Sequence, residues 1–290
     1  MGDWVLGVLG GSGVYDLEGL DNPRWKRLHT PWGEPSDELL FGELGGVRLV
    51  FLPRHGRGHR LLPGEVNARA NIDALKRAGC TDVLSLSAVG SLREDLPPGT
   101  FVMVDQYIDR TFARERTFFG DGVIAHVSLA RPVCPRLSAL AAEAGHAASA
   151  PVVEGGTYLA MEGPQFSTRA ESELYRAWGC HVIGMTNMPE ARLAREAELP
   201  YASVCMVTDW DCWRDDVAEV EAGHVLETLT ANAAKARALV AGLAAALART
   251  PRTPSPIDTV LDAALLTPPG QWSAEARLRL AAVAGRVLGR

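Results

Sequence analysis

Two aspartates, Asp209 and Asp211, stand one residue apart directly after the apolar run 201–207. Such a run predicts a buried strand, and ligands of open α/β sheets bind where strands end. Carboxylates near a core are unfavourable unless they are protonated, hydrogen-bonded or matched to a ligand. A protonated Asp209 can donate to a ring nitrogen while an ionised Asp211 accepts from an exocyclic amine, which suits adenine. Taken alone, the motif is more often a helix or turn cap.

Groups suited to an oxyanion follow three further predicted strands. They are Ser12 in the glycine-rich segment 10–13, Arg54 and His55 in the segment 53–59, and Ser87 with Ala88 after the strand 83–86. Glycines let backbone N–H groups approach an anion, and a guanidinium can bind two phosphate oxygens at once. Each segment alone could be a tight turn, a solvated basic loop or a core serine. Together they predict convergence on one phosphate.

A metal site is a weaker interpretation of the same residues. His55 and His59 are four apart, but Gly56 and Gly58 oppose the helix that this spacing needs, and no acidic residue lies between them. The five cysteines are scattered without a CxxC spacing, which indicates structural thiols in a reducing compartment. We therefore expect no metal.

The bulk composition is that of an ordinary globular protein. The 290 residues are 47% hydrophobic and 22% charged, with a net charge of −6. This balance does not favour nucleic acid or an anionic membrane as a partner. The N-terminal residues lack a signal-peptide pattern, and no apolar run reaches membrane-spanning length. We expect a cytoplasmic protein with a small-molecule ligand.

Predicted strands and helices alternate along most of the chain, which indicates an α/β fold. Apolar runs predict strands at 5–9, 47–52, 83–86, 101–104, 157–161, 181–185 and 201–207. Helical periodicity and capping signals predict helices at 67–78, 135–145, 167–178, 189–198 and 219–249. We expect a single domain, 1–250, with a central mixed sheet flanked by helices. A proline-rich break then starts a tail, 251–290, which ends in an amphipathic helix over 273–288 and packs on the body or on a neighbouring subunit.

Several segments together resemble one known family. They are GGSG (10–13), PRHGRGH (53–59), VNARANIDALKRAGC (66–80), SAVGSLRED (87–95), DQYIDRT (105–111), EGPQFSTRAES (162–172), VIGMTNMPEARLAREAELPYAS (182–203) and TDWDCW (208–213). In this order the chain resembles the trimeric purine nucleoside phosphorylases, in their S-methyl-5′-thioadenosine phosphorylase branch. The departures are modest: Ser12 and Ser87 stand where threonine is common, and Gln165 and Gly184 where relatives often carry Arg and Asn.

The resemblance implies a phosphorolysis. Inorganic phosphate, a co-substrate, attacks C1′ of the ribose, and the products are adenine and 5-methylthioribose 1-phosphate. The implied phosphate site comprises Ser12, Arg54, His55, Ser87, Ala88 and Thr186. Met185 would lie against the ribose, Phe166 would border the base, and Asp209 and Asp211 would contact its edge. No cofactor, metal or covalent intermediate is implied.

Asp209 is the expected general acid towards N7 of the purine, which requires a raised pKa. Ser167 and Asp209 stand where the related 6-oxopurine enzymes carry Glu and Asn, so we expect a 6-aminopurine preference. On the helix after the aspartates, Ala222 and Val225 would face the methylthio group. His224, next to Val225, would favour a 5′-hydroxyl instead if the helix were turned by one residue.

The family assembles as a homotrimer, and a histidine in the segment matching 124–132 reaches the adjacent site. His126 is therefore a candidate for a cross-subunit contact, and an ordinary surface histidine is the alternative. Leu265 or Leu266 would close the neighbouring pocket. Two other functions stay open: a broader purine nucleoside or methylthioinosine phosphorylase, and a non-catalytic nucleotide-binding protein on the same fold.

Overall fold

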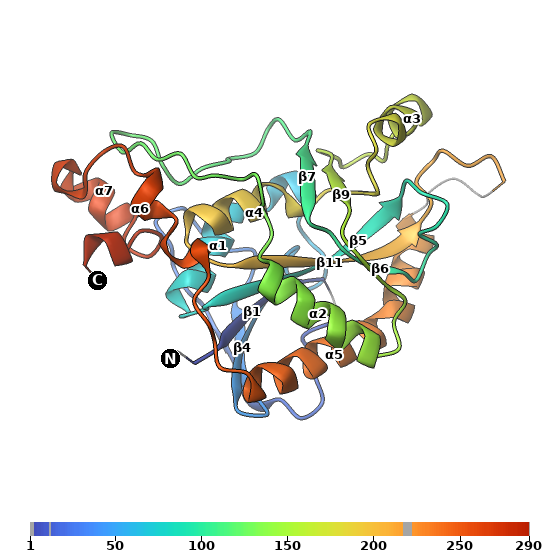
Figure 1. The fold of residues 1–290 in the computed structure, drawn as a ribbon, viewed down its shortest axis with the longest axis horizontal. Helices are drawn as coiled ribbons and strands as arrows, with labels where there is room; N and C mark the ends of the chain where they lie inside the picture. Colours follow the sequence, from blue (N-terminus) through green and yellow to red (C-terminus); the bar gives the residue numbers. More distant parts are fainter. Residues whose placement is uncertain (1–2, 12, 217–221, 290) are drawn as a thin grey trace.

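The computed structural model describes residues 3–11, 13–216 and 222–289, and shows a mixed sheet between two helical layers (Figure 1). The strands are β1 (Val5–Gly10), β2 (Asp21–Lys26), β3 (Leu39–Leu44), β4 (Val47–Pro53), β5 (Asp82–Ser91), β6 (Phe101–Met103), β7 (Gln106–Asp109), β8 (Val152–Glu154), β9 (Thr157–Ala160), β10 (Val182–Gly184) and β11 (Tyr201–Asp209). The predicted α/β fold with a central mixed sheet is confirmed, because parallel and antiparallel strand pairs occur in one sheet that helices flank.

The helices cover both faces of the sheet. They are α1 (Ala68–Arg77), α2 (Pro135–Ala147), α3 (Arg169–Ala177), α4 (Asn187–Glu196), α5 (Ala222–Arg249), α6 (Leu261–Ala264) and α7 (Ala274–Arg279), with 3-10 turns η1 (Pro63–Glu65), η2 (Pro256–Thr259), η3 (Pro269–Gln271) and η4 (Arg286–Leu288). α1 packs with α4 on one face, and α2 packs with α5 on the other. Among the described residues, no helix has both the length and the apolar character needed to cross a bilayer.

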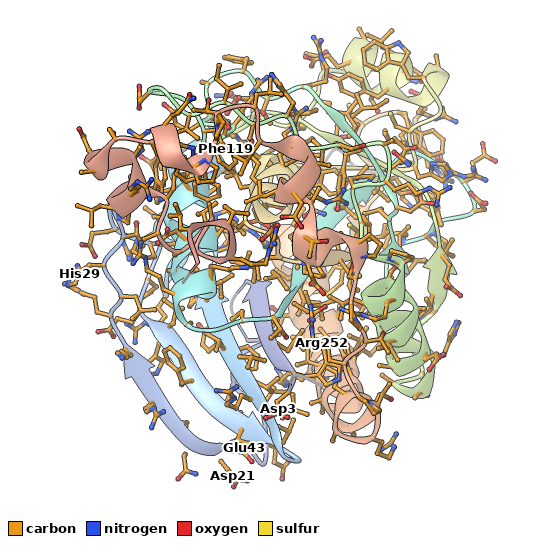
Figure 2. The ribbon with its side chains drawn as sticks, turned by 60° about the vertical axis from the view of Figure 1, so that its left-hand side comes forward. Asp3, Asp21, His29, Glu43, Phe119 and Arg252 are labelled. Carbon is orange, nitrogen blue, oxygen red and sulfur yellow. The ribbon has the colours of Figure 1, made fainter. Side chains whose placement is uncertain are left out.

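The sheet branches at β5, which is the longest strand. The main path runs β2-β3-β4-β1-β5-β10-β9-β7, while β11 pairs with β5 and β6, and β6 pairs with β8. β1, β4, β5 and β11 run parallel, so their carboxyl ends meet at one edge. β2, β3 and β4 form antiparallel pairs, and β2 is the outer strand of the path. Asp21 of β2 pairs with Glu43 of β3 at the surface (Figure 2).

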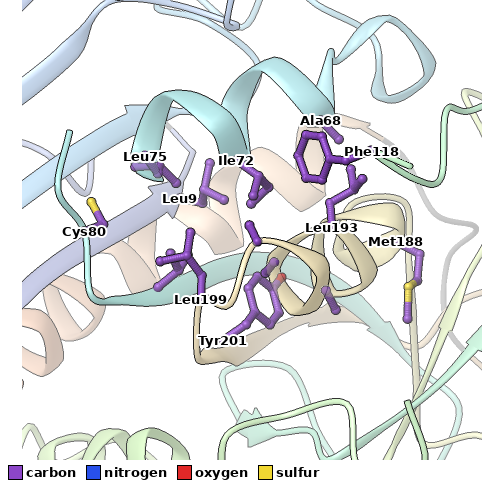
Figure 3. Packing of buried hydrophobic residues seen from close by; sticks show 14 of the residues in the cluster. Leu9, Ala68, Ile72, Leu75, Cys80, Phe118, Met188, Leu193, Leu199 and Tyr201 are labelled. Atoms are coloured by element: carbon purple, nitrogen blue, oxygen red, sulfur yellow. The ribbon is translucent and has the colours of Figure 1, made fainter. Parts of the chain in front are cut away.

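Each face of the sheet has its own apolar core. On the α1–α4 face, Leu9, Ile72, Leu75 and Tyr201 are nearly or fully buried and belong to one cluster (Figure 3). α1 begins at the N-cap Asn67, whose side chain accepts the N–H of Ala70, and its apolar side faces this cluster. The periodic apolar residues therefore fix how α1 lies on the sheet.

The C-terminal tail packs on the body of the same chain. Leu261, Trp272, Leu280 and Val283 are buried within the same cluster as the α1–α4 face. Arg252, on the segment that leaves α5 (Figure 2), donates to the fully buried Asp82 at 2.6 Å. The tail is thus part of the folded core, while the boundary after residue 250 stays a prediction.

Several sequence-based element limits are wrong. The predicted tail helix over 273–288 is two short pieces, α7 and η4, because the chain turns between residues 280 and 285. The strand predicted at 83–86 continues to Ser91. The strands β2, β3, β7 and β8 had no prediction; β2 is exposed along its whole length, so it has no buried apolar pattern to detect.

Replacing a buried tail leucine tests whether the tail unfolds with the body. Leu280→Ala removes a fully buried side chain and should lower the free energy of unfolding by about 2–5 kcal/mol. Leu278→Ala, two residues earlier in α7 and 68% exposed, is the matched control and should change it little. Denaturant unfolding followed by circular dichroism gives both values. A separate early transition in the Leu280 variant would show that the tail unfolds alone.

Candidate active site

A cavity of about 630 Å³ opens at the carboxyl edge of the parallel strands. This volume lies in the range of small-molecule sites. Its walls come from the segments after β1 and β4, from β5, from β10 and β11, and from α5. Ten of the residues predicted from the sequence line it: Arg54, His55, Ser87, Ala88, Phe166, Met185, Thr186, Asp209, Asp211 and Val225. Residues from distant parts of the chain therefore meet in one cavity.

The remaining predicted residues are placed differently. Ser12 lies outside the described residues, as does the side chain of Ala222, with which α5 begins. Ser167 stands behind the lining, where its hydroxyl lies 3.7 Å from the Sδ of Met161. His126 is exposed, and its N–H donates to the carbonyl of Ala264 in the tail. No cluster of three or more possible metal ligands occurs in the described part of the chain.

Ser87 and Ala88 lie inside β5, not at its end as the sequence suggested. β11 is paired with β5 so that Cys205 stands beside Ser87 and Asp209 beside Gly90. At about 3.3 Å per residue, three residues of strand separate Ser87 from the level of Asp209 by about 10 Å. That spacing leaves room for one sugar ring between an anion at Ser87 and a base at Asp209.

A bulge at the end of β11 aims the first aspartate. The pairing of β11 with β5 shifts between Val207 and Asp209, and such bulges redirect a side chain. Asp209 Oδ1 accepts the N–H of Asp211 at 2.8 Å, and Oδ2 lies 2.7 Å from the hydroxyl of Thr208. A Cβ on Gly90 would stand 2.8 Å from Oδ1, so this close approach requires glycine there. Burial raises the pKa of Asp209, against these hydrogen bonds, and favours its protonated form.

Asp211 keeps one carboxylate oxygen without a partner among the described residues. It is 5% exposed, adopts the left-handed backbone with φ 52°, and its buried Oδ2 accepts no hydrogen bond. Burial raises its pKa, the charge of Asp209 adds to this, and the hydroxyls of Ser172 and Ser167 lower it. Buried polar atoms are nearly always satisfied, so this oxygen is an unusual acceptor without a protein donor, in a residue that lines the cavity.

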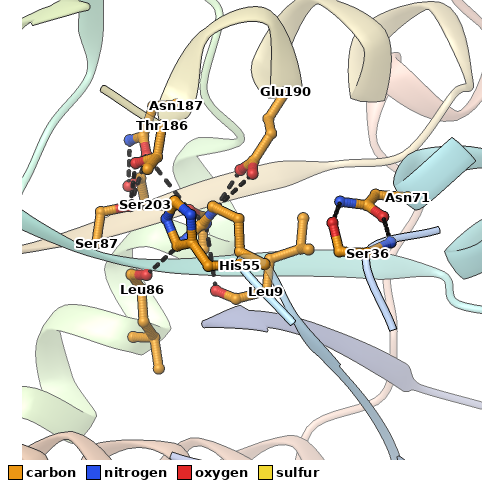
Figure 4. A network of polar contacts seen from close by, with 12 residues as sticks. Leu9, Ser36, His55, Asn71, Leu86, Ser87, Thr186, Asn187, Glu190 and Ser203 are labelled. Atoms are coloured by element: carbon orange, nitrogen blue, oxygen red, sulfur yellow. Dashed lines mark hydrogen bonds and ion pairs between the residues drawn. The ribbon is translucent and has the colours of Figure 1, made fainter. Parts of the chain in front are cut away.

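The guanidinium of Arg54 is turned towards a carboxylate behind the cavity. Arg54 is 2% exposed; Nε and Nη2 donate to Glu190, Nη2 also to Ser85, and Nη1 to the carbonyl of Leu86 (Figure 4). A guanidinium has five N–H groups. One Nη1 hydrogen has no partner among the described residues. In this structure Glu190 accepts from two nitrogens of the guanidinium, and a bidentate contact of Arg54 with phosphate stays a prediction.

His55 is a neutral ring in this arrangement. Its Nδ1 lies 2.9 Å from the carbonyl of Leu61, which can only accept, so Nδ1 carries the proton. Burial and then the charge of Arg54 lower the pKa of His55 to about 4. The ring of His59 stacks on it with centroids 4.6 Å apart. At neutral pH the Nε2 atom therefore offers a lone pair.

Sequence reasoning missed residues that hold the lining in place. Arg114 donates to Glu162 at 2.8 Å and to the carbonyls of Met185 and Met188 at 2.6 and 2.9 Å. Glu190 and Asn187 bind other lining residues from within α4. The sequence signal for Asn187 and Glu190 was the segment 182–203 that carries the resemblance, whereas Arg114 lies outside every such segment.

Gly184, one of the departures from the family pattern, makes room for Tyr158. A Cβ there would lie 2.2 Å from the Tyr158 hydroxyl, which accepts the N–H of Thr186 at 3.2 Å. Gly184→Ala should lower the free energy of unfolding by about 1–3 kcal/mol through overpacking. Gly242→Ala in α5, where the nearest atom is 3.5 Å away, should instead be neutral or stabilising. Equal unfolding midpoints for the Gly184 variant and the wild type would contradict this packing argument.

The fold and the cavity define an α/β protein with a ligand-sized site at the carboxyl edge of its sheet, where carboxylates and hydroxyls face one space. The model of the phosphorylase superfamily matches residues 5–248. The chain is 60% identical over 286 residues to S-methyl-5′-thioadenosine phosphorylase of Cereibacter sphaeroides, covering 98% of both chains, and 58% identical to that of Rhodospirillum rubrum, covering 98% and 97%. The chain therefore belongs to the phosphorylase superfamily.

Solved structures agree with this assignment. A methylthioadenosine phosphorylase from an antarctic soil metagenomic library superposes with a TM-score of 0.91 at 47% identity, covering 98% of this chain and 99% of that one. Methylthioadenosine phosphorylase from Schistosoma mansoni, in complex with adenine, gives a TM-score of 0.81 at 38% identity, covering 86% and 93%. The likeness extends through the C-terminal tail in the first case.

Proposed function

We propose that this protein catalyses the phosphorolysis of S-methyl-5′-thioadenosine to adenine and 5-methylthioribose 1-phosphate. One observation carries the proposal: a single cavity has two aspartates at the end of β11 and Ser87 about 10 Å from that level along β5. His55 and Thr186 line the same cavity. Relatives with this named activity cover almost the whole chain. The reaction belongs to the salvage of methionine and purines.

Asp209 is the general acid. Cleavage of the C1′–N9 bond leaves negative charge on the adenine, and the protonated Asp209 donates its proton to N7. Burial favours the protonated form that this step needs. Phosphate forms the new C1′–O bond, and the proton of hydrogenphosphate restores the acid when the products leave. Atoms and charge balance without a cofactor.

Phosphate binds between Arg54, His55, Ser87, Ala88 and Thr186, with Ser12 as a further ligand. Arg54 contributes its one free Nη1 hydrogen. The Nε2 lone pair of His55 accepts a hydrogen bond from the hydroxyl of a hydrogenphosphate ion, because the other ring nitrogen already donates to Leu61. This arrangement holds the nucleophile in line with C1′.

The base is recognised at its 6-amino group. The unpartnered Oδ2 of Asp211 accepts from this amine, while Phe166, 43% exposed, covers one side of the base. Ser167 orients the Asp211 carboxylate from behind the lining. A 6-oxo group would place an acceptor against an acceptor, so methylthioinosine and inosine should react poorly.

The 5′-methylthio group lies against α5. Val225 lines the cavity together with Leu229, Thr230, Ala233 and Ala236, so most of that wall is apolar. Ala222 stands one turn earlier on the same helix. We further propose a homotrimer in which His126 reaches the adjacent site; its exposure and the bonding of its segment to the tail are compatible with this role.

A substrate comparison tests the proposal. The protein is incubated with methylthioadenosine, adenosine or methylthioinosine, with and without phosphate, and the free base is followed. Adenine release that requires phosphate and is fastest from the thioether supports the proposal. A preference for methylthioinosine would identify the broader purine specificity, and absence of turnover with every substrate would leave a nucleotide-binding protein.

A further inference from the structure

Asn187, the first residue of α4, is fully buried behind the phosphate end of the cavity. Its Oδ1 accepts the hydroxyl of Ser87 at 2.8 Å and faces those of Ser85 and Thr186 at 3.4 Å (Figure 4). Its Nδ2 donates to Ser203 at 2.5 Å. One side chain thus joins α4 to the two strands beneath the site.

The strands provide a matching polar patch. Ser85 and Ser87 alternate on β5, and their partners on β11 are Ser203 and Cys205, so the four side chains share one face. All four are small, which leaves space for the amide of Asn187 on an otherwise apolar sheet. This placement makes the amide the common partner of the hydroxyls around it.

Ser87 and Thr186 line the cavity, whereas Asn187 is not among its lining residues. Their oxygens are 3.0 Å apart. A hydroxyl has one proton to donate. Ser87 donates its one proton to Asn187, so the Ser87 oxygen can only accept. It accepts from Thr186 when no anion is bound. The Thr186 proton can then turn to an incoming anion while the Ser87 oxygen stays in place.

The fixed charges around this end are largely compensated. Arg54 is paired with Glu190, Arg114 is paired with Glu162, and His55 is neutral at pH 7. Uncompensated positive charge is therefore scarce among the described residues that line the cavity. The affinity for a phosphate dianion must therefore rest on hydroxyl and backbone donors more than on charged side chains. The directions in which these hydroxyls donate then affect the affinity.

We propose that Asn187 is a positioning residue for phosphate: it accepts the Ser87 proton in a hydrogen bond, so that the Ser87 oxygen holds the Thr186 hydroxyl at the cavity and Thr186 donates to the oxyanion. It acts through these two side chains and does not touch the ligand. The inference rests on the proposed phosphorolysis for its kinetic test, but it also predicts phosphate binding in the absence of nucleoside.

Asn187→Ala tests the inference by separating phosphate from nucleoside. The KM for phosphate should rise about tenfold, the equivalent of about 1.4 kcal/mol, while the KM for methylthioadenosine stays within about twofold. A merely structural residue would change both KM values or neither. If Asn187→Ala does not fold, Asn187→Ser, which keeps a polar atom but cannot span the two strands, is measured in the same way.

Ser203→Ala is the matched control. It removes the other partner of the same amide, at the same depth but outside the cavity lining, so it should lower thermal stability without changing the KM for phosphate. The double variant Ser87→Ala/Asn187→Ala is the coupling test. If Asn187 acts through Ser87, its removal from the Ser87→Ala protein should have much less effect on the phosphate KM.

Phosphate-induced thermal stabilisation separates failure of this inference from failure of the proposed function. Inorganic phosphate alone should raise the Tm of the wild type, and clearly less that of Asn187→Ala, whether or not the protein turns over methylthioadenosine. An unchanged phosphate dependence in both Asn187→Ala and Asn187→Ser overturns the inference. An equal loss in Ser203→Ala also overturns it, because the effect would then be structural.

Discussion

Asp209→Asn should lower kcat for methylthioadenosine by about 10²–10⁴-fold, the usual contribution of a positioned general acid. The amide keeps the shape of the side chain but has no acidic proton for N7. Phosphate affinity should change little, because Asp209 lies about 10 Å along the strand from Ser87. Steady-state kinetics and phosphate-induced changes in Tm check the two halves of this expectation.

The pH dependence gives an independent check on the same residue. Turnover by the wild type should fall as the pH rises through the raised pKa of Asp209, because only the protonated acid is active.

The stability of the fold should change with pH in the same direction. A carboxyl group whose pKa is raised in the folded state stabilises the fold fully below its unfolded-state pKa, and it loses this contribution as the pH rises through its folded-state pKa. Asp209→Asn should therefore be at least as stable as the wild type at neutral pH. A variant with wild-type turnover would remove Asp209 from its role.

Glu190→Gln should lower the free energy of unfolding by about 3–5 kcal/mol, because it leaves the charge of Arg54 buried without a counter-charge. Both side chains are 2% exposed or less, and Tyr201 also donates to Glu190 at 3.1 Å. Asp95→Asn breaks an exposed pair with Arg93 and serves as the control, with an expected change within about 1 kcal/mol. Denaturant unfolding measures both variants.

Glu190→Gln should also make the thermal stability of the protein depend more strongly on phosphate. Without Glu190 the guanidinium of Arg54 lacks an anionic partner, and a phosphate ion in the adjoining cavity can replace it. Phosphate should then raise the Tm of Glu190→Gln by more than that of the wild type. An equal rise would mean that Arg54 cannot turn to the cavity, and its phosphate role would be limited to the single Nη1 hydrogen.

Local signals in the sequence predicted the main helices, the core strands and some of the residues around the cavity. A capping box of Ser167 or Thr168 with Glu171 predicted the start of α3, where Thr168 is the N-cap, and the apolar run before Asp209 is the buried strand β11. These features depend on neighbours within a few residues, which a sequence displays directly. The family segments then brought Asp209, Asp211, Ser87 and Thr186 together in one hypothesis.

Only the tertiary structure decided how the polar groups are paired. Arg54 meets Glu190 across 136 residues of chain, and Asn187 meets Ser87 across 100, so no local pattern marks either contact. Packing settles such pairs, because a buried donor takes whichever acceptor the fold brings within reach. For the same reason, the neutral state of His55 follows from burial and from the carbonyl of Leu61, and the split of the tail helix follows from the core against which it folds.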